Sequence, residues 1–144
     1  MKRNRKRWMV IGMLALVCLL LPGCGRQQVQ RQEETEAQEE EIQIGLSFDS
    51  FVIERWMRDR DVFVSKAQNL GAEVNVQNAN GDVEEQISQI EYFINKDMDV
   101  IVIIAIDGEA LTDVVKEAKN AGIKVISYDR LIMNAGTDLY ISFD

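Results

Sequence analysis

The stretch Asp99–Ala105 reads DVIVIIA, an almost continuous run of apolar and mostly β-branched residues. Such a run is typical of a parallel strand that is buried on both faces. Shorter apolar-rich segments on either side predict four more strands, at Ile42–Phe48, Glu73–Gln77, Ile123–Tyr128 and Leu139–Phe143.

Amphipathic segments lie between these strands and predict three helices. The first spans about Ile53–Leu70 and ends at Gly71, where a glycine at the C′ position is expected. Its inward face is expected to consist of Ile53, Trp56, Met57, Phe63, Ala67 and Leu70. Asp82, with Glu85 three residues later, predicts the start of the second helix, and Gly108–Ala121 the third. Strands and helices that alternate at these lengths predict an α/β fold with a doubly wound parallel sheet.

The first 23 residues have the pattern of an export signal peptide. Five basic residues precede the apolar run Trp8–Leu21, whose 14 residues are too few to span a bilayer comfortably. The residues Leu21-Pro22-Gly23-Cys24 then resemble a bacterial lipobox. We expect residues 1–23 to be removed and Cys24 to carry a lipid that anchors the chain at the outer face of the cytoplasmic membrane. The alternative is a buried cysteine that happens to follow an apolar run.

Residues 24–41 contain that cysteine and a stretch rich in Gln and Glu, with almost no apolar side chain to bury. Such a segment cannot offset its ordering entropy, so we expect a disordered tether before a folded domain at 42–144. Loss of the five basic residues of the signal peptide leaves 11 Lys+Arg against 24 Asp+Glu, a net charge of −13. A domain this acidic is repelled by nucleic acids and anionic lipids, which favours a small molecule or a protein as partner.

Metal and cofactor chemistry finds little support in the sequence. Cys18 would leave with the signal peptide, Cys24 would be lipidated, and the chain has no histidine. No thiol or imidazole then remains for a disulfide, zinc or another transition metal. A G-x-G-x-x-G turn and a G-x-x-x-x-G-K-[ST] loop are both absent. We therefore expect no metal, no cofactor and no enzymatic activity.

Ligands of an open parallel sheet bind beyond the carboxyl ends of its strands. That rule selects Asp49-Ser50-Phe51 with the following Arg55 and Trp56, Asn78-Ala79-Asn80, Asp107-Gly108, and Asp129-Arg130. Carboxylates, amides and guanidinium groups can meet adjacent sugar hydroxyls in pairs. A tryptophan ring can cover the apolar face of a pyranose. These loops therefore predict a monosaccharide as the ligand.

Each candidate also has an interpretation that involves no ligand. These are a surface ion pair for Asp129 and Arg130, core packing for Trp56, a solvated charge for Arg55, turn formation for Asn78 and Asn80, and helix capping for Asp107.

The segments that carry these residues are similar to periplasmic sugar-binding proteins of type I, and within them to the D-xylose-binding proteins of ABC transporters. The similarity covers Ile44–Asp144. It is carried by Ile53-Glu54-Arg55-Trp56, Asp59-Arg60-Asp61, Val76–Gly81, Gln89-Ile90-Glu91, Val114–Lys119, Tyr128-Asp129-Arg130 and Tyr140–Asp144.

The resemblance implies two lobes joined by a hinge, with the sugar held between them. This chain would then be an incomplete N-terminal lobe that first crosses to the second lobe at Tyr140–Asp144. By position, the resemblance implies sugar contacts for Arg55, Trp56, Asp129 and Arg130. It places Asn78, Asn80 and Asp107 in loops near the site, without assigning them a contact. The implied ligand is D-xylose or a related aldose, delivered to an ABC permease or, alternatively, presented to a membrane histidine kinase.

A receiver-like phosphoacceptor domain is an alternative of a different class. It shares the doubly wound sheet and an acid after the third strand, here Asp107. It also needs an acidic pair after the first strand to hold Mg²⁺, and only Asp49 lies there. A cytoplasmic receiver also disagrees with a signal peptide.

Overall fold

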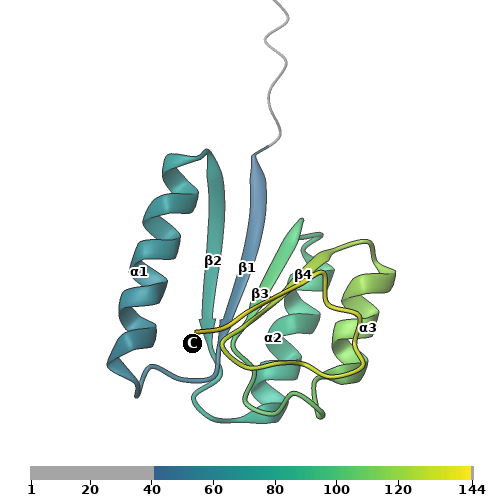
Figure 1. Cartoon of the computed structure of the whole chain (residues 1–144). Helices are drawn as coiled ribbons and strands as arrows, with labels where there is room; N and C mark the ends of the chain where they lie inside the picture. The colour runs from purple at the N-terminus through teal and green to yellow at the C-terminus, as the bar shows by residue number, and fades with distance from the viewer. Residues whose placement is uncertain (1–40, 144) are drawn as a thin grey trace, which may run out of the picture. The chain divides into compact units, whose positions relative to one another are not determined.

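Strands and helices alternate from Ile42 onward in the computed structural model, which describes residues 41–143. The predicted signal peptide, Cys24, the tether up to residue 40, and Asp144 lie outside the described residues. The elements are β1 (Ile42–Phe48), α1 (Glu54–Asn69), β2 (Ala72–Asn78), α2 (Val83–Asn95), β3 (Val100–Ile103), α3 (Thr112–Asn120), β4 (Lys124–Tyr128) and β5 (Leu139–Ile141). The five strands form one parallel sheet in the order β2-β1-β3-β4-β5 (Figure 1). The α/β doubly wound prediction is confirmed.

The central strand β3 separates two hydrophobic clusters. Its side chains alternate between the faces of the sheet, so Ile101 and Ile103 join the cluster built with α2 and α3. Val102 and Ile104 join the cluster on the α1 side. All four are at most 4% exposed, which confirms the prediction of a strand buried on both faces. Helix α1 lies on one side of the sheet and α2 and α3 on the other (Figure 1).

The face that carries α1 is only partly covered. Trp56 and Ala67 of α1 are buried, but Ile53, Met57 and Leu70 are 44%, 36% and 72% exposed. The prediction that these three side chains point into the core is therefore wrong. The reason is that, among residues 41–143, α1 is the single helix on this face. Beside α1 runs an apolar groove of about 630 Å³, the α1 groove, lined mainly by Ile44, Leu46, Val62, Phe63, Leu70, Val102, Ile104 and Ile126.

The ends of α2 and α3 differ in how well the sequence predicts them. Asp82 caps α2 as expected, because its carboxylate accepts hydrogen bonds from the backbone N–H groups of Glu84 and Glu85. Helix α3 begins at Thr112 rather than at Gly108. Residues 108–111 form turns instead, and a Cβ on Gly108 would lie 2.3 Å from the Leu131 carbonyl oxygen. That close approach brings the loop after β3 against the loop after β4. No helix between residues 41 and 143 is long and apolar enough to cross a membrane.

Candidate ligand-binding site

The chain makes a strained turn where β4 ends. The Arg130 N–H donates to the Tyr128 carbonyl oxygen at 2.8 Å, and Asp129 between them has a φ of 65°. A three-residue turn with this hydrogen bond and a positive φ is a rare γ-turn. The turn is held in place because the Asp129 N–H donates to the Ile141 carbonyl oxygen of β5 at 2.7 Å, and the buried Ser127 hydroxyl donates to the Arg130 carbonyl oxygen at 2.6 Å. Such strain concentrates at functional sites, which marks this turn as a candidate.

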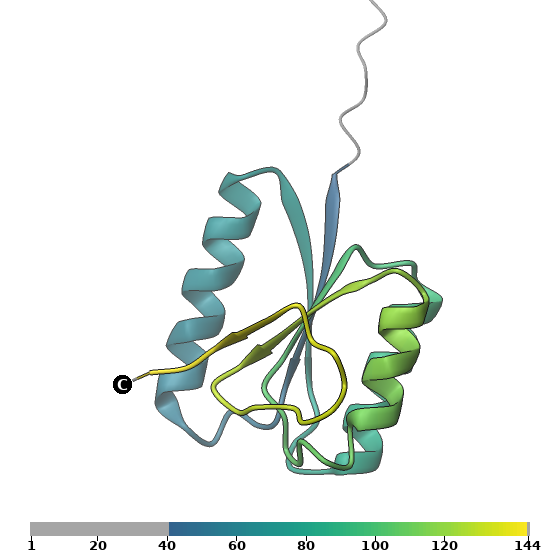
Figure 2. The same ribbon diagram turned by 45° about the vertical axis from the view of Figure 1, so that its right-hand side comes forward.

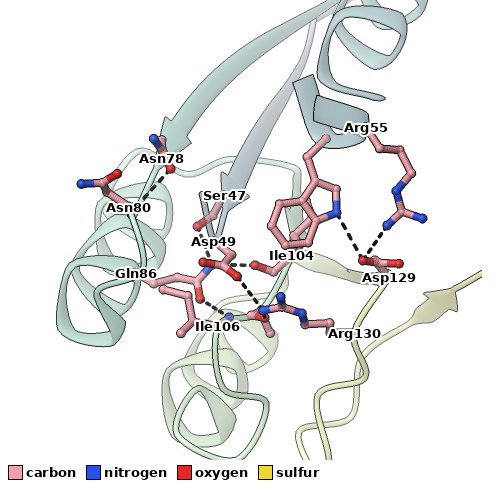
Figure 3. Close-up of polar contacts among 12 residues, drawn as sticks. Ser47, Asp49, Arg55, Asn78, Asn80, Gln86, Ile104, Ile106, Asp129 and Arg130 are labelled. Carbon is pink, nitrogen blue, oxygen red and sulfur yellow. Dashed lines mark hydrogen bonds and ion pairs between the residues drawn. The ribbon is translucent and has the colours of Figure 1, made fainter. Parts of the chain in front are cut away.

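The turn projects the Asp129 carboxylate toward the start of α1. Its Oδ2 accepts hydrogen bonds from Arg55 Nη2 at 2.8 Å and from the Trp56 indole N–H at 3.2 Å (Figure 3). The hydrogen bond to Asp129 is the main reason why the pKa of Arg55 is raised above its ordinary value. No group among residues 41–143 donates to Oδ1 of Asp129, and the side chain is 20% exposed. Oδ1 can therefore accept a hydrogen bond from a ligand hydroxyl.

Arg130 is held by two different loops. Its Nη1 donates to Asp49 Oδ2 at 2.6 Å and to the Ala105 carbonyl oxygen at 2.8 Å. Within the described part of the chain, the other guanidinium nitrogens have no hydrogen-bond partner, and the side chain is 40% exposed. Arg130 and Asp129 do not pair with each other, so the surface ion pair that their adjacency suggests is not present. Arg130 can thus offer a fork of donors to a pair of ligand hydroxyls.

Asp49 lies in a loop that the sequence analysis selected, but it was not among the predicted sugar contacts. It follows β1, and its side chain is only 13% exposed where it meets Arg130. The sequence signal for a role of Asp49 is its position directly after β1, because ligands of parallel sheets bind beyond the carboxyl ends of the strands. Its partner lies 81 residues further along the chain, and no spacing rule predicts such a pair.

Trp56 lies in the core and also borders the candidate site. Its side chain is 1% exposed and packs with Leu46 and Phe48 in the cluster under α1. Its indole N–H reaches the Asp129 carboxylate, and the Arg130 guanidinium lies 5.0 Å from the centre of its ring. Trp56 therefore belongs to the core and orients two charged groups of the site. In this structure its ring face is covered by Arg130 rather than open.

Arg55 links the turn to the end of the described chain. Its guanidinium lies 4.5 Å from the centre of the Phe143 ring, and that ring packs edge-on against Tyr128. The Tyr128 hydroxyl donates to Asp59 of α1 at 2.9 Å. Burial, with a further contribution from that hydrogen bond, raises the pKa of Tyr128 to about 12. The chain beyond β5 accordingly runs toward the start of α1 (Figure 2).

Asn78, Asn80 and Asp107 have local roles in the structure. The Asn78 side-chain oxygen accepts from the Asn80 N–H at 3.0 Å, and Asn80 has a φ of 56°, so the pair forms a turn. Both lie at the end of β2, on the far side of Asp49 from Asp129 (Figure 3). The Asp107 carboxylate accepts from the N–H groups of Ala110 and Glu109, and these bonds lower its pKa. None of the three bonds to Asp129 or Arg130.

A family model described as a periplasmic binding protein domain matches residues 44–144. The chain therefore belongs to the periplasmic binding protein family, and its sheet order and site at the carboxyl edge agree with that assignment.

The chain is similar to several sugar-binding proteins. The D-xylose-binding periplasmic protein of Haemophilus influenzae is 57% identical over 108 residues, which are 75% of this chain and 32% of that protein. The Escherichia coli protein of the same name is 56% identical over 108 residues, or 75% of this chain and 33% of the relative. An ABC transporter solute-binding protein of Clostridium phytofermentans, solved with bound β-D-glucose, is 38% identical with a TM-score of 0.68, over 71% of this chain and 32% of that one. The chain thus spans about a third of the length of these proteins.

Proposed function

We propose that this chain contributes one side of an extracytoplasmic binding site for D-xylose or a closely related aldose. The observation that carries the proposal is the strained turn at Asp129, which places Asp129 and Arg130 at the carboxyl edge of the sheet. There Asp129 Oδ1 and two guanidinium nitrogens of Arg130 have no hydrogen-bond partner among residues 41–143. The identity of 57% to a D-xylose-binding protein supports the choice of sugar.

Three charged side chains would meet the sugar in this proposal. Asp129 accepts hydrogen bonds from sugar hydroxyls through Oδ1, and Arg130 donates to neighbouring hydroxyl oxygens. Arg55, 44% exposed, extends the donor edge beside Asp129. Trp56 holds Asp129 and Arg130 in place, and its ring meets a sugar only if Arg130 moves off it. Where such groups are shielded from water, a site of this kind discriminates sugars well, because a missing hydroxyl leaves a polar group unpaired.

The proposal extends to the sugar's destination and to the anchor. We propose that Cys24 carries a lipid, that the binding domain stands outside the cytoplasmic membrane on the tether, and that an ABC permease receives the sugar. The lipobox pattern of residues 21–24 supports the anchor, and the solved ABC transporter solute-binding protein supports the permease. Replacement of Cys24 by Ala should release the protein from membranes or leave it unprocessed. Unchanged fractionation and migration of that variant would refute the anchor.

Trp56 offers a direct test of the sugar site, because it is the only tryptophan after residue 23. D-xylose added to the processed chain should change the indole fluorescence in a saturable way, while glycerol at the same concentration should not. The Asp129→Ala variant should abolish the change. If the wild type gives no response to D-xylose that exceeds the response to glycerol, the proposed function is wrong.

A further inference from the structure

A buried polar network lies directly beneath the Arg130 side of the site. Gln86 and Gln89 of α2 are 0% and 4% exposed, and Ser47 of β1 is 0% exposed. The Ser47 hydroxyl donates to Gln89 Oε1 at 3.1 Å and accepts from Gln86 Nε2 at 3.2 Å. Buried polar side chains are costly unless they are fully hydrogen-bonded, so their presence on an otherwise apolar helix face needs an explanation.

Gln86 bonds the backbone on both sides of one residue. Its Nε2 donates to the Ile104 carbonyl oxygen at 3.0 Å, and its Oε1 accepts from the Ile106 N–H at 2.9 Å (Figure 3). The residue between them is Ala105, whose carbonyl oxygen accepts from Arg130 Nη1. The Ala105 carbonyl and the Ile106 N–H belong to the same peptide group, so Gln86 fixes the peptide group that accepts from Arg130 and also the peptide group before it.

Gln86 also links the ends of β1 and β3, and the loops that follow these two strands supply both partners of Arg130. Through Ser47, Gln86 contacts β1 two residues before Asp49, and through the loop backbone it contacts the end of β3 just before Ala105. Asp49 and Ala105 are the two groups that hold Nη1 of Arg130. The relative position of these two acceptors decides where the free edge of the guanidinium points.

We propose that Gln86 is a positioning residue for the sugar site: it aims the Ala105 carbonyl at Arg130 and so orients the guanidinium edge that faces the ligand. This inference rests on the proposed function for its purpose, but its structural part concerns Arg130 alone. Gln86 touches no ligand in this arrangement, since its side-chain atoms are buried against Ser47 and the loop after β3.

Gln89 provides a matched control on the same helix. It is also buried and also bonds Ser47, but its second partner is the Glu85 carboxylate and not the loop after β3. Gln86→Met and Gln89→Met each remove one buried amide and leave a side chain of similar length. A purely structural role predicts similar effects of the two changes on the site. A positioning role predicts that only Gln86→Met disturbs Arg130.

The experiment follows the Nε–Hε NMR signal of Arg130 in the purified chain, together with the affinity for D-xylose in the same samples. Gln86→Met should shift or broaden the Arg130 signal and weaken xylose binding about tenfold, as expected when a hydrogen bond to a charged group is lost. Gln89→Met should leave both unchanged even if it lowers stability. Should Gln86→Met fail to fold, Gln86→Glu keeps an acceptor for the Ile106 N–H. Its ionised carboxylate cannot donate to the Ile104 carbonyl oxygen and repels it, so at a pH where this carboxyl is ionised the variant should also shift the Arg130 signal.

The outcomes separate this inference from the proposed function. An Arg130 signal that is unaltered in the folded Gln86 variants, or altered equally by Gln89→Met, overturns the positioning role even where xylose binds. A selective change of the Arg130 signal in a chain that shows no response to xylose supports the role of Gln86 and refutes the sugar proposal instead.

Discussion

The turn at Asp129 makes a quantitative prediction about stability. Asp129→Ala leaves the indole N–H of the buried Trp56 without its acceptor, which costs about 1–3 kcal/mol. Ala also tolerates the φ of 65° less well than Asp does, which adds about 1 kcal/mol. The lost ion pair with the exposed Arg55 contributes little, because water screens it. The free energy of unfolding should therefore fall by about 2–4 kcal/mol, as the sum of these two contributions.

The isosteric change Asp129→Asn provides the comparison. Asn keeps an oxygen for the indole N–H and tolerates a positive φ, so stability should change by only about 0.5 kcal/mol. Urea unfolding of both variants, and of each in a Trp56→Phe background, measures the difference. In that background the indole N–H is gone, and the gap between Ala and Asn should shrink. If Asp129→Ala destabilises the chain no more than Asp129→Asn does, then neither the hydrogen bond from Trp56 nor the positive φ of Asp129 contributes to stability as proposed.

Three further predictions follow from other parts of the fold. Hydrogen bonds from the Lys119 ammonium and the Val125 N–H lower the pKa of Asp138 below its ordinary 3.8. The ionised Asp138 therefore contributes fully to stability above pH 3.8, and this contribution is lost as the pH falls through the lower pKa of the folded state. In Asp138→Asn, the free energy of unfolding should therefore fall less steeply at acid pH than in the wild type. The same pH dependence in both proteins would contradict this. Gly45→Ala places a Cβ 2.6 Å from the Phe93 ring and should cost about 1–3 kcal/mol by urea unfolding; an unchanged midpoint would contradict the packing. The chain should self-associate through the α1 groove in sedimentation experiments, and Val62→Glu, at a position 70% exposed, should reduce this; equal association of both proteins would show that the groove is not involved.

The sequence predicts the strands well and selects the loops after them as the candidate site, because both steps depend on local pattern. The run DVIVIIA marks a strand buried on both faces wherever it lies in the sheet. Asp129-Arg130 directly follows a strand, and the carboxyl ends of parallel strands are where ligands of such sheets bind. Asp82 caps its helix through bonds that span only three residues. Local chemistry suffices in each of these cases.

The remaining features depend on neighbours that are distant in sequence. Apolar periodicity shows that α1 has an inward face, but not whether a second element covers the side chains at its border, such as Leu70. The pairing of Asp49 with Arg130 depends on how the ends of β1 and β4 are placed in the sheet. A glutamine in a helix is normally exposed. The backbone at Ile104 and Ile106 and the hydroxyl of Ser47 explain why Gln86 is buried.

The measurement that tests the central claim most directly is a D-xylose titration of the ¹⁵N-labelled chain, followed by amide and arginine side-chain NMR signals. We expect weak binding in fast exchange, because the described residues present the sugar with one open edge and each polar contact competes with water. The shifts should be confined to the residues at the ends of β1, β3 and β4, with the largest at Asp129 and Arg130, and they should vanish in Arg130→Ala. Shifts that map elsewhere, such as to the α1 groove, or that persist unchanged in Arg130→Ala, would contradict the account.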